Sequence, residues 1–466
     1  MLRASSICEA AGVPTSSLIS EGFVAQARPT SIGLGFPNIA IAVVPGHPGA
    51  QSIEELRKNI TEHTLDEVID NLLQAPACSM TVRESAAREI VCKGGFDEVN
   101  RYFIDNELSD GLPIVPPTIE KIEAFLGYTE RKPEEVLGVL LPDSRAASIW
   151  SIAVNGVMAG CRPEYMPILV AMIEAMADPA YGVEHSGNTP GSDTLIILNG
   201  PIIKELGFNY TQGVMRDGCL PNTSIGRFWR LYLRNVAGFL LHKTDKGTFG
   251  NTWRVVVPEN EDAVKKIGWP NNAVEMGFGQ DDNSVTIARY SGGNVIASIS
   301  GATPEDILPN ICDHLERQIT WQVTFTVGQG LGTLRPLILL TPIIAQTIAR
   351  AGWTKQMVKQ YFYDHARIPA WKFERTLKVW MNKPVWDLED EVRQGHIPKV
   401  YAESSDPNRL VPTVWRPEDY MIAVTGDELR TNAYVFAHNG LLGYPVGKKI
   451  CLPKDWEQRR PKVKSA

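Results

Sequence analysis

The chain alternates between short apolar runs and longer segments in which apolar residues recur at helical spacing. A run of about four to eight apolar residues that ends at a turn residue is typical of a buried strand. Helices with a capping residue followed by proline begin at Thr303-Pro304 and Thr341-Pro342. The alternation predicts an α/β fold. The strands that we predict cover residues 13–19, 38–44, 194–198, 253–258, 285–290, 294–300, 335–341 and 421–425.

One stretch joins two apolar helices, which are predicted over residues 148–159 and 166–176. Gly160 suits the end of the first helix because glycine tolerates the left-handed conformation of a C-terminal cap. Pro163 suits the first position of the second helix. Cys161 therefore lies just before a helix N-terminus, where the helix dipole lowers a thiol pKa. A buried structural cysteine at a helix corner is the alternative, and both interpretations stay open.

The domain organisation predicted from the pattern has a small first part and a large second part. Fifty residues are too few for a complete doubly wound domain, so we expect the rest before Met1 or on another chain. Ser52-Ile53-Glu54-Glu55 is a capping box that starts the next helices. No internal repeat is apparent. The predicted parts are a partial Rossmann-like unit (1–50), a helical linker (51–95), a large α/β domain (96–456) and a basic tail (457–466).

Composition narrows the class of protein. Of 466 residues, 44% are apolar and 21% are charged, which is typical of a globular protein. A net charge of −7 argues against binding to nucleic acid or to an acidic membrane. No apolar run is long enough to cross a membrane, and no signal peptide is visible. The seven cysteines include no C-x-x-C pair, so we expect no zinc site, no disulfide framework and a cytoplasmic location.

Three residues are candidates for catalysis. Cys161 is a candidate nucleophile or redox thiol. His185 lies in a polar, glycine-rich loop, and its ordinary pKa near neutrality suits a general acid or base. Asp110 lies in a proline-rich loop, residues 109–118, that would hold it in a fixed position. For Cys161 and Asp110 a purely structural role is the alternative: a packed thiol in the first case, and an Asp-Gly turn with a proline-rich brace in the second.

Amide and guanidinium side chains near turns are candidates for binding a substrate. Ligands of open α/β sheets bind at the carboxyl ends of strands, where Asn199 follows a predicted strand. Asn222 or Thr223 caps a helix predicted to reach Leu241, and the free N–H groups of its first turn, with Arg227, suit an anion. A normal cap beside a solvated basic face is the alternative. The residues assigned to substrate binding are Asn155, Arg162, Asn199, Asn222 and Arg227.

Several motifs resemble the UGSC family of (seleno)proteins. In the first part, the N-terminal helix is followed by Ala11-Gly12-Val13-Pro14-Thr15, and a later strand ends in Val44-Pro45-Gly46-His47-Pro48. In the second part the similar segments are residues 110–118, 153–165, 198–201 and 222–227. The first part is also similar, more distantly, to the selenoprotein B component of glycine reductase.

The resemblance implies an intracellular, oligomeric protein and a reductive or thiol-dependent reaction. The family carries a redox motif, Cys or Sec-Gly-Ser-Cys, on a loop before the first helix. Cys8 does not match this motif, because Ser5-Ser6-Ile7-Cys8 lies inside the helix that should follow the loop. The motif is therefore expected upstream of the start codon or on a redox partner chain, or the activity does not need it.

Three functions follow from these observations. The first is an enzyme that acts on a small anionic organic substrate by thiol-dependent or reductive chemistry. The second is a lyase or hydratase that acts on a carbon–heteroatom bond through Asp, Glu and His, with structural cysteines and with or without a metal ion. The third is a non-catalytic subunit of a complex. The sequence does not identify a cofactor. A homo-oligomer or a complex with a redox partner is expected, without nucleic acid or membrane.

Overall fold

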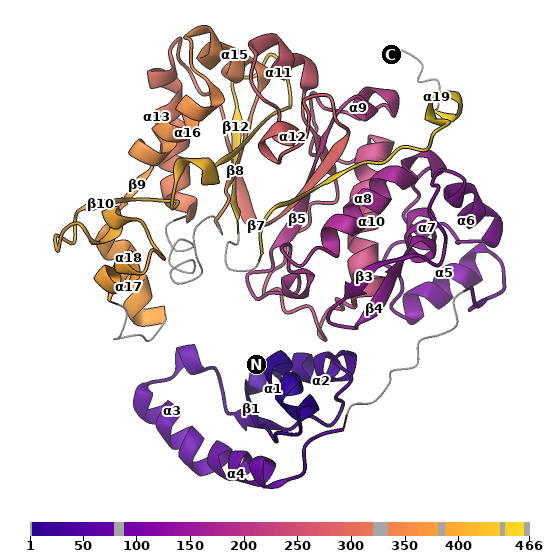
Figure 1. Cartoon of the computed structure of the whole chain (residues 1–466), viewed down its shortest axis with the longest axis vertical. Helices are drawn as coiled ribbons and strands as arrows, with labels where there is room; N and C mark the ends of the chain where they lie inside the picture. Colours follow the sequence, from indigo (N-terminus) through magenta and orange to yellow (C-terminus); the bar gives the residue numbers. More distant parts are fainter. Residues whose placement is uncertain (1, 79–87, 320–333, 381–386, 439–442, 461–466) are drawn as a thin grey trace.

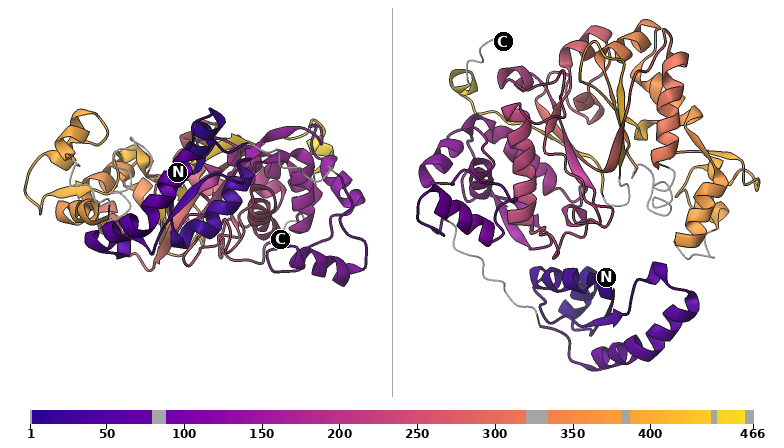
Figure 2. Two further views of the ribbon diagram at one scale, coloured as in Figure 1. Left: turned by 90° about the horizontal axis from the view of Figure 1, so that it is seen from below. Right: turned by 180° about the vertical axis from the view of Figure 1, so that it is seen from behind.

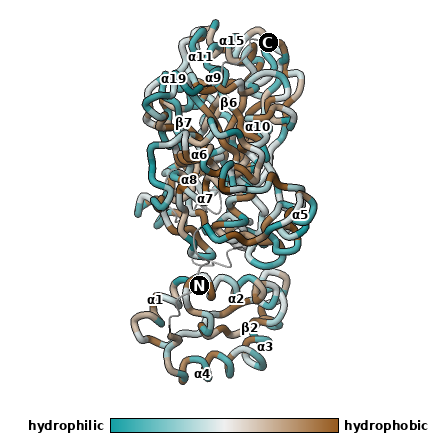
Figure 3. Tube along the Cα trace, turned by 90° about the vertical axis from the view of Figure 1, so that its right-hand side faces the viewer, coloured by the Kyte–Doolittle hydropathy of each residue, from teal (hydrophilic) through white to brown (hydrophobic). Residues whose placement is uncertain are grey.

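The computed structural model describes residues 2–78, 88–319, 334–380, 387–438 and 443–460. Helices and strands alternate through these segments, and the largest sheet contains both parallel and antiparallel pairs, so the fold is α/β as predicted (Figure 1). None of the helices in these segments is long and apolar enough to cross a membrane. Apolar residues concentrate inside the large unit, and polar residues lie along its outside (Figure 3).

The N-terminal unit is built on two parallel strands, with Ser17 opposite Ile41. Its small core contains Ile19, Phe36 and Ile39. The predicted strand at 38–44 is present but begins three residues later, at Ile41. The elements are α1 (Leu2–Ala10), β1 (Ser17–Ser20), η1 (Glu21–Phe23), α2 (Val24–Gly33), β2 (Ile41–Val44), η2 (Pro48–Ala50), α3 (Ile53–Asn59), η3 (Ile60–Thr64) and α4 (Leu65–Leu73).

The large unit begins with helices and a short hairpin and continues into the main sheet. Up to its longest strand, the elements are α5 (Phe96–Asp105), α6 (Ile119–Leu126), β3 (Val136–Leu140), β4 (Arg145–Ser148), α7 (Ile149–Met158), η4 (Pro163–Tyr165), α8 (Met166–Met176), η5 (Val183–His185), β5 (Asp193–Asn199), α9 (Ile202–Glu205), α10 (Leu220–Tyr232), η6 (Leu233–Ala237), β6 (Val256–Pro258), α11 (Glu261–Ile267), α12 (Asn272–Glu275) and β7 (Ser284–Ile296).

The rest of the unit completes the sheet and covers its other half. The elements are α13 (Pro304–Ile319), β8 (Leu337–Leu340), α15 (Pro342–Arg350), α16 (Lys355–His365), β9 (Arg367–Pro369), α17 (Ala370–Trp380), α18 (Leu388–Arg393), η7 (Lys399–Ala402), β10 (Leu410–Pro412), η8 (Pro417–Asp419), β11 (Met421–Val424), β12 (Ala433–His438), β13 (Val446–Lys449) and α19 (Trp456–Arg459). Of the predicted basic tail, residues 461–466 lie outside the described residues.

The predicted strands at 285–290 and 294–300 are one strand, β7, and the prediction of two was wrong. The first half of β7 pairs with β5 and β13, and its second half pairs with β12. The change of partner falls at Tyr290, which lies opposite both Asp193 and His438. Gly292 and Gly293 follow after Ser291. Two glycines resemble a strand break in the sequence, but here they mark the place where one strand changes neighbours.

The main sheet has the strand order β11-β8-β12-β7-β5-β6, with β13 beside β7. β5 runs parallel to β6, and β8 runs parallel to β11. The two pairs meet at their carboxyl ends: Asn260 N donates to Val424 O at 2.7 Å, and Thr425 Oγ1 donates to Pro258 O at 2.7 Å. The sheet is therefore curled, and four strands end at one edge. The N-terminal unit lies at the opposite end of the large unit (Figures 1 and 2).

Alternation along the strands separates three apolar cores. Leu195 and Ile197 face the inside of the curled sheet together with Val255, Val257 and Ala288. Ile196 and Leu198 face outward into the core built on α7, α8 and α10. The outward-facing residues of β8, β11 and β12 pack in a second helical core, which includes α13, α15 and α16. Strands buried on both faces explain the continuous apolar runs in the sequence.

One strand of each parallel pair has a similar sequence, together with the helix start that follows it, although no repeat was apparent from the sequence. In the first, Leu195-Ile196-Ile197-Leu198-Asn199-Gly200-Pro201-Ile202-Ile203 forms the strand and the start of α9. In the second, Leu337-Ile338-Leu339-Leu340-Thr341-Pro342-Ile343-Ile344 forms the strand and the start of α15. The helices that follow differ in length, with four residues in α9 and nine in α15. This difference and the long separation hide the repeat from inspection.

Helix α10 was predicted to continue to Leu241, but it changes to a π-helical turn at Leu233 and ends at Gly238, whose φ is +92°. The same helix approaches β6 closely at Gly226. A Cβ atom added there would overlap the backbone of Arg254 and Val255.

We predict that Gly226→Ala lowers the stability of the large unit by about 1–3 kcal/mol, because the overlap must be relieved by moving backbone. Thermal unfolding followed by circular dichroism measures the change. Gly292→Ala is the control, since nothing lies within 4 Å of its added Cβ. Equal melting temperatures for the two variants would contradict the close approach.

Candidate active site at the strand ends

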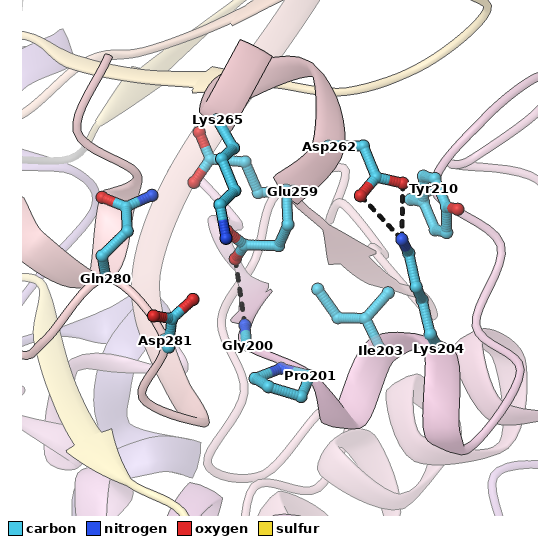
Figure 4. Close-up of a pocket in the computed structure, with 11 residues that line it drawn as sticks. Gly200, Pro201, Ile203, Lys204, Tyr210, Glu259, Asp262, Lys265, Gln280 and Asp281 are labelled. Carbon is cyan, nitrogen blue, oxygen red and sulfur yellow. Dashed lines mark hydrogen bonds and ion pairs between the residues drawn. The ribbon is translucent and has the colours of Figure 1, made fainter. Parts of the chain in front are cut away.

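A cavity of about 220 Å³ lies where β5 and β6 end (Figure 4). We call it the strand-end pocket. Carboxylates outnumber amines in its wall, so its lining is polar and acidic. The residues that line it are Gly200, Pro201, Ile203, Lys204, Tyr210, Glu259, Glu261, Asp262, Lys265, Gln280 and Asp281.

The turn after β5 forms one side of the pocket. Gly200 has a φ of +100°, and a Cβ there would overlap Asn283 and the carbonyl of Asp282. Only glycine fits this close approach without strain. Asn283 Oδ1 accepts a hydrogen bond from Ile202 N at 2.9 Å, which fixes the start of α9. The predicted turn at Asn199-Gly200-Pro201 is therefore part of the pocket wall.

Two glutamates that follow β6 are joined by the side chain of Asn199. Asn199 Nδ2 donates to Glu259 Oε2 and to Glu261 Oε1, both at 2.8 Å. Glu261 also accepts Gly200 N at 2.9 Å and Asn271 Nδ2 at 2.9 Å. Among the residues predicted to bind substrate, Asn199 is the one that lies in this group.

Glu259 is completely buried behind Glu261. Its other hydrogen-bond donors are the backbone N–H groups of Asn272, at 2.7 Å, and Val424, at 3.1 Å. Lys355 Nζ, also buried, lies 4.0 Å from Glu259 Oε1 and donates to Ile422 O at 3.0 Å. Burial raises the pKa of Glu259, and the charge of Lys355 opposes this change. A carboxyl with a raised pKa is suited to hold and return a proton.

The mouth of the pocket carries charges of both signs. Lys204 is paired with Asp262, with Nζ 2.7 Å from Oδ1. Lys265 and Asp281 are exposed and extend toward the cavity from opposite sides (Figure 4). Glu261 and Asp281 therefore offer acceptors to a bound molecule, and Lys265 offers a cation.

Cys161, Asp110 and Arg227 lie near one another but not at this pocket. Arg227 binds Asp110 through two hydrogen bonds, Nε to Oδ2 at 3.0 Å and Nη2 to Oδ1 at 2.8 Å. Arg254 lies 3.5 Å from the same carboxylate. Burial alone would raise the pKa of Asp110, but the two arginines outweigh it and hold that pKa below its usual value. Arg227 is thus already engaged by a protein carboxylate, so its expected role in anion binding is not supported.

Cys161 does not have the activated thiol that the helix-dipole argument predicts. The chain before α8 forms a 3₁₀ turn at Pro163–Tyr165, and the side chain of Cys161 is packed in the core. Burial raises its pKa to about 12, and Ser224 and Arg227 only partly oppose this change. The expected lowering of the pKa is therefore wrong. The cap at Gly160 is as predicted, with φ +79° and Cys161 N donating to Gly156 O at 3.0 Å.

The remaining predicted binding residues have structural partners. Asn222 is fully buried and donates to Asn209 O at 2.8 Å and Val256 O at 3.0 Å. The side chain of Asn155 bonds Ser151 O and Asn235. Arg162 is exposed and lies 4.0 Å from Glu164. Asn155, Arg162 and Asn222 therefore do not share a cavity with Asn199.

His185 lies at the other end of the large unit, in a loop that contacts the N-terminal unit. Its neighbour Glu184 pairs with Arg3 of that unit at 3.0 Å. Burial lowers the pKa of His185, Glu184 opposes this change, and Arg289 and Arg3 reinforce it. The structure does not bring His185 together with Cys161 or with the strand-end pocket. Its assignment as acid or base stays a prediction.

Glu259, Glu261 and Lys355 were missed as candidates. A signal existed for the glutamates, because they follow the predicted strand at 253–258 directly and therefore lie at a carboxyl end. Lys355 gave no signal, since it is distant in sequence and lies in an ordinary helical pattern.

Within the described segments, no group of three or more His, Cys, Asp or Glu side chains is arranged to hold a metal ion.

Comparison with known proteins supports the resemblance to the expected family in the N-terminal part of the chain. Residues 2–74 match the model of the UGSC family. No curated protein and no solved structure matches the chain. The resemblance of the large unit to the same family, and the similarity to selenoprotein B, stay predictions.

We predict that Cys161 resists alkylation in the folded protein, because a thiol with a pKa of about 12 is almost entirely protonated at pH 8. Iodoacetamide labelling mapped by mass spectrometry should modify Cys8 and Cys451, which are exposed, and spare Cys161 until the protein is unfolded. Rapid labelling of Cys161 in the folded state would restore it as a candidate nucleophile.

We predict that Arg227→Met lowers stability by about 3 kcal/mol at pH 7, because it leaves a buried carboxylate with Arg254 alone. The pKa of Asp110 is lowered by folding, so the contribution of the pair is complete above the ordinary carboxyl pKa and is lost as the pH falls below it. Urea unfolding at several pH values should show the two proteins converging in acid. Arg430→Met, which removes an exposed ion pair, is the control and should change little. A pH-independent difference would contradict this account.

Proposed function

We propose that the chain is an acid–base enzyme of the lyase or hydratase type, which acts on a small anionic organic substrate in the strand-end pocket. The observation that supports this proposal most is the pair of carboxyls, Glu259 and Glu261, joined by one amide of Asn199. Their environments differ, since Glu259 is fully buried and Glu261 lies at the pocket. Two carboxyl groups in different environments are a recurring basis for acid–base catalysis.

In the proposed reaction Glu261 removes a proton from the carbon next to the carboxylate of the substrate. Lys265 binds that carboxylate and stabilises the negative charge that develops. The hydroxyl or amino group on the following carbon leaves with a proton from Glu259, whose protonated form is favoured by burial. In the reverse direction, water or ammonia adds to the double bond and the two carboxyls exchange roles.

Thiol-dependent or reductive chemistry is the weaker alternative. Cys161 is packed in the core with a raised pKa, and it does not line the strand-end pocket. The third possibility is a subunit that supports a partner chain. It would give the paired carboxyls no catalytic role. Catalysis by the chain alone separates the acid–base enzyme from that possibility.

The test uses hydrogen exchange, which does not require the leaving group to be known. The protein in D₂O is incubated with 3-hydroxypropionate and β-alanine, and proton NMR follows deuterium incorporation at the carbon next to the carboxylate. We expect exchange with at least one of these compounds. Glu261→Gln should reduce the rate by about 10²-fold or more, because an amide cannot take the proton.

Two controls make the result specific. Cys161→Ala should retain the exchange, and so should Glu54→Gln, which changes an exposed glutamate of α3. The proposal fails if no compound exchanges, or if exchange is unaffected by Glu261→Gln and lost in Cys161→Ala.

A further inference from the structure

Three polar atoms beside Glu259 are buried without a hydrogen-bond partner among the described residues. They are Asn199 Oδ1, Asn272 Oδ1 and Ser284 Oγ. Their residues are exposed by 0%, 1% and 0%, respectively. Leaving one such atom unpaired destabilises a folded protein, and three in one place are unusual.

These residues converge on the inner face of the curled sheet. Asn199 and Ser284 lie directly opposite each other on β5 and β7, so their side chains are neighbours on that face. Asn272 reaches the same place from α12, with N donating to Glu259 Oε2 at 2.7 Å and Nδ2 donating to Thr286 Oγ1 at 2.9 Å. We call Asn199, Asn272 and Ser284 the acceptor cluster.

The acceptor cluster adjoins the strand-end pocket through Glu259. This carboxyl lines the pocket and also accepts the amide of Asn199 and the backbone N–H of Asn272. Glu261 covers Asn199 from the pocket side, held by the 2.8 Å hydrogen bond.

The chemistry of the cluster selects a hydrogen-bond donor. Two amide oxygens are acceptors only, and a serine hydroxyl donates or accepts. An apolar group would leave all three unpaired, and an anion would face the oxygens of Asn199 and Asn272 and the carboxyl of Glu259. An amino or hydroxyl group would pair with them.

We propose that the acceptor cluster is the subsite for an amino or hydroxyl group of the substrate, so that the substrate class is a small amino- or hydroxycarboxylate. Its carboxylate extends toward Lys265 at the mouth, and its donor enters beside Glu259. This inference rests on the proposed function for the location of the substrate. It adds the identity of the group that the pocket recognises.

The test compares ligands that differ in one group, by calorimetric titration of the full chain with propionate, 3-hydroxypropionate and β-alanine. Propionate lacks the donor, 3-hydroxypropionate carries a hydroxyl and β-alanine carries an ammonium. We expect 3-hydroxypropionate or β-alanine to bind at least about tenfold more tightly than propionate, because a site built to pair with a donor rejects an analogue without it. Equal affinities, or no binding of any of the three, would overturn the proposal.

A pair of serine variants tests the cluster itself. Ser284→Ala removes an unpaired hydroxyl, so the melting temperature should stay the same or rise while the preference over propionate falls severalfold. Ser109→Ala is the matched control: Ser109 is also buried, but it donates to Leu112 O and accepts Gly111 N. That variant should melt at a lower temperature and keep the ligand preference.

The opposite pattern, with Ser284→Ala less stable and its ligand preference intact, would assign the hydroxyl a structural role and overturn the subsite. Binding is measured without turnover, so the two proposals fail separately. Selective binding without deuterium exchange would reject only the acid–base reaction. Exchange without selectivity for the donor would reject only the subsite.

Discussion

The hydrogen bonds between the ends of β6 and β11 are the constraint on which the candidate site depends. Thr425 donates to Pro258 O, and Asn260 donates to Val424 O, so the two edge strands of the main sheet are joined at one end. The four strands that end there would otherwise lie at two separate edges. Closing the sheet in this way brings polar groups from β5, β6, β7 and β11 around a single buried carboxyl.

The ionised form of a carboxyl buried in this position has a cost that the fold must offset. Glu259 loses its hydration completely, and a single counter-charge rarely compensates for that loss. Its three N–H donors and the ammonium of Lys355 supply the compensation from four different segments. Lys355 in turn lies 3.7 Å from Glu275, which binds Lys359 at 2.8 Å. Such a network is hard to justify by stability alone, because apolar residues of similar size would pack there at less cost.

Most strands, and the position of Asn199 at a strand end, were predictable from the sequence, whereas the surroundings of Cys161 and Arg227 were not. The apolar runs, and the turn residues that end them, located most strands. The same pattern of neighbouring residues was sufficient to assign Asn199 to the end of a strand. The pKa of Cys161 depends on residues that are distant from it in the sequence. Its pKa is raised because it is packed in the core beside Ser224 of α10, far along the chain, whereas the helix-dipole argument considered only its neighbours in sequence. Likewise, Arg227 resembled a free cation until the structure paired it with Asp110.

The change of pairing partner along β7 has a consequence for how the large unit unfolds. One strand supplies the neighbour of β5 in the first half of the sheet and the neighbour of β12 in the second half. Neither half retains a complete sheet if β7 detaches, although each half has a helical core of its own. The two similar halves are therefore not separate folding units. We therefore expect both halves to unfold in one cooperative transition.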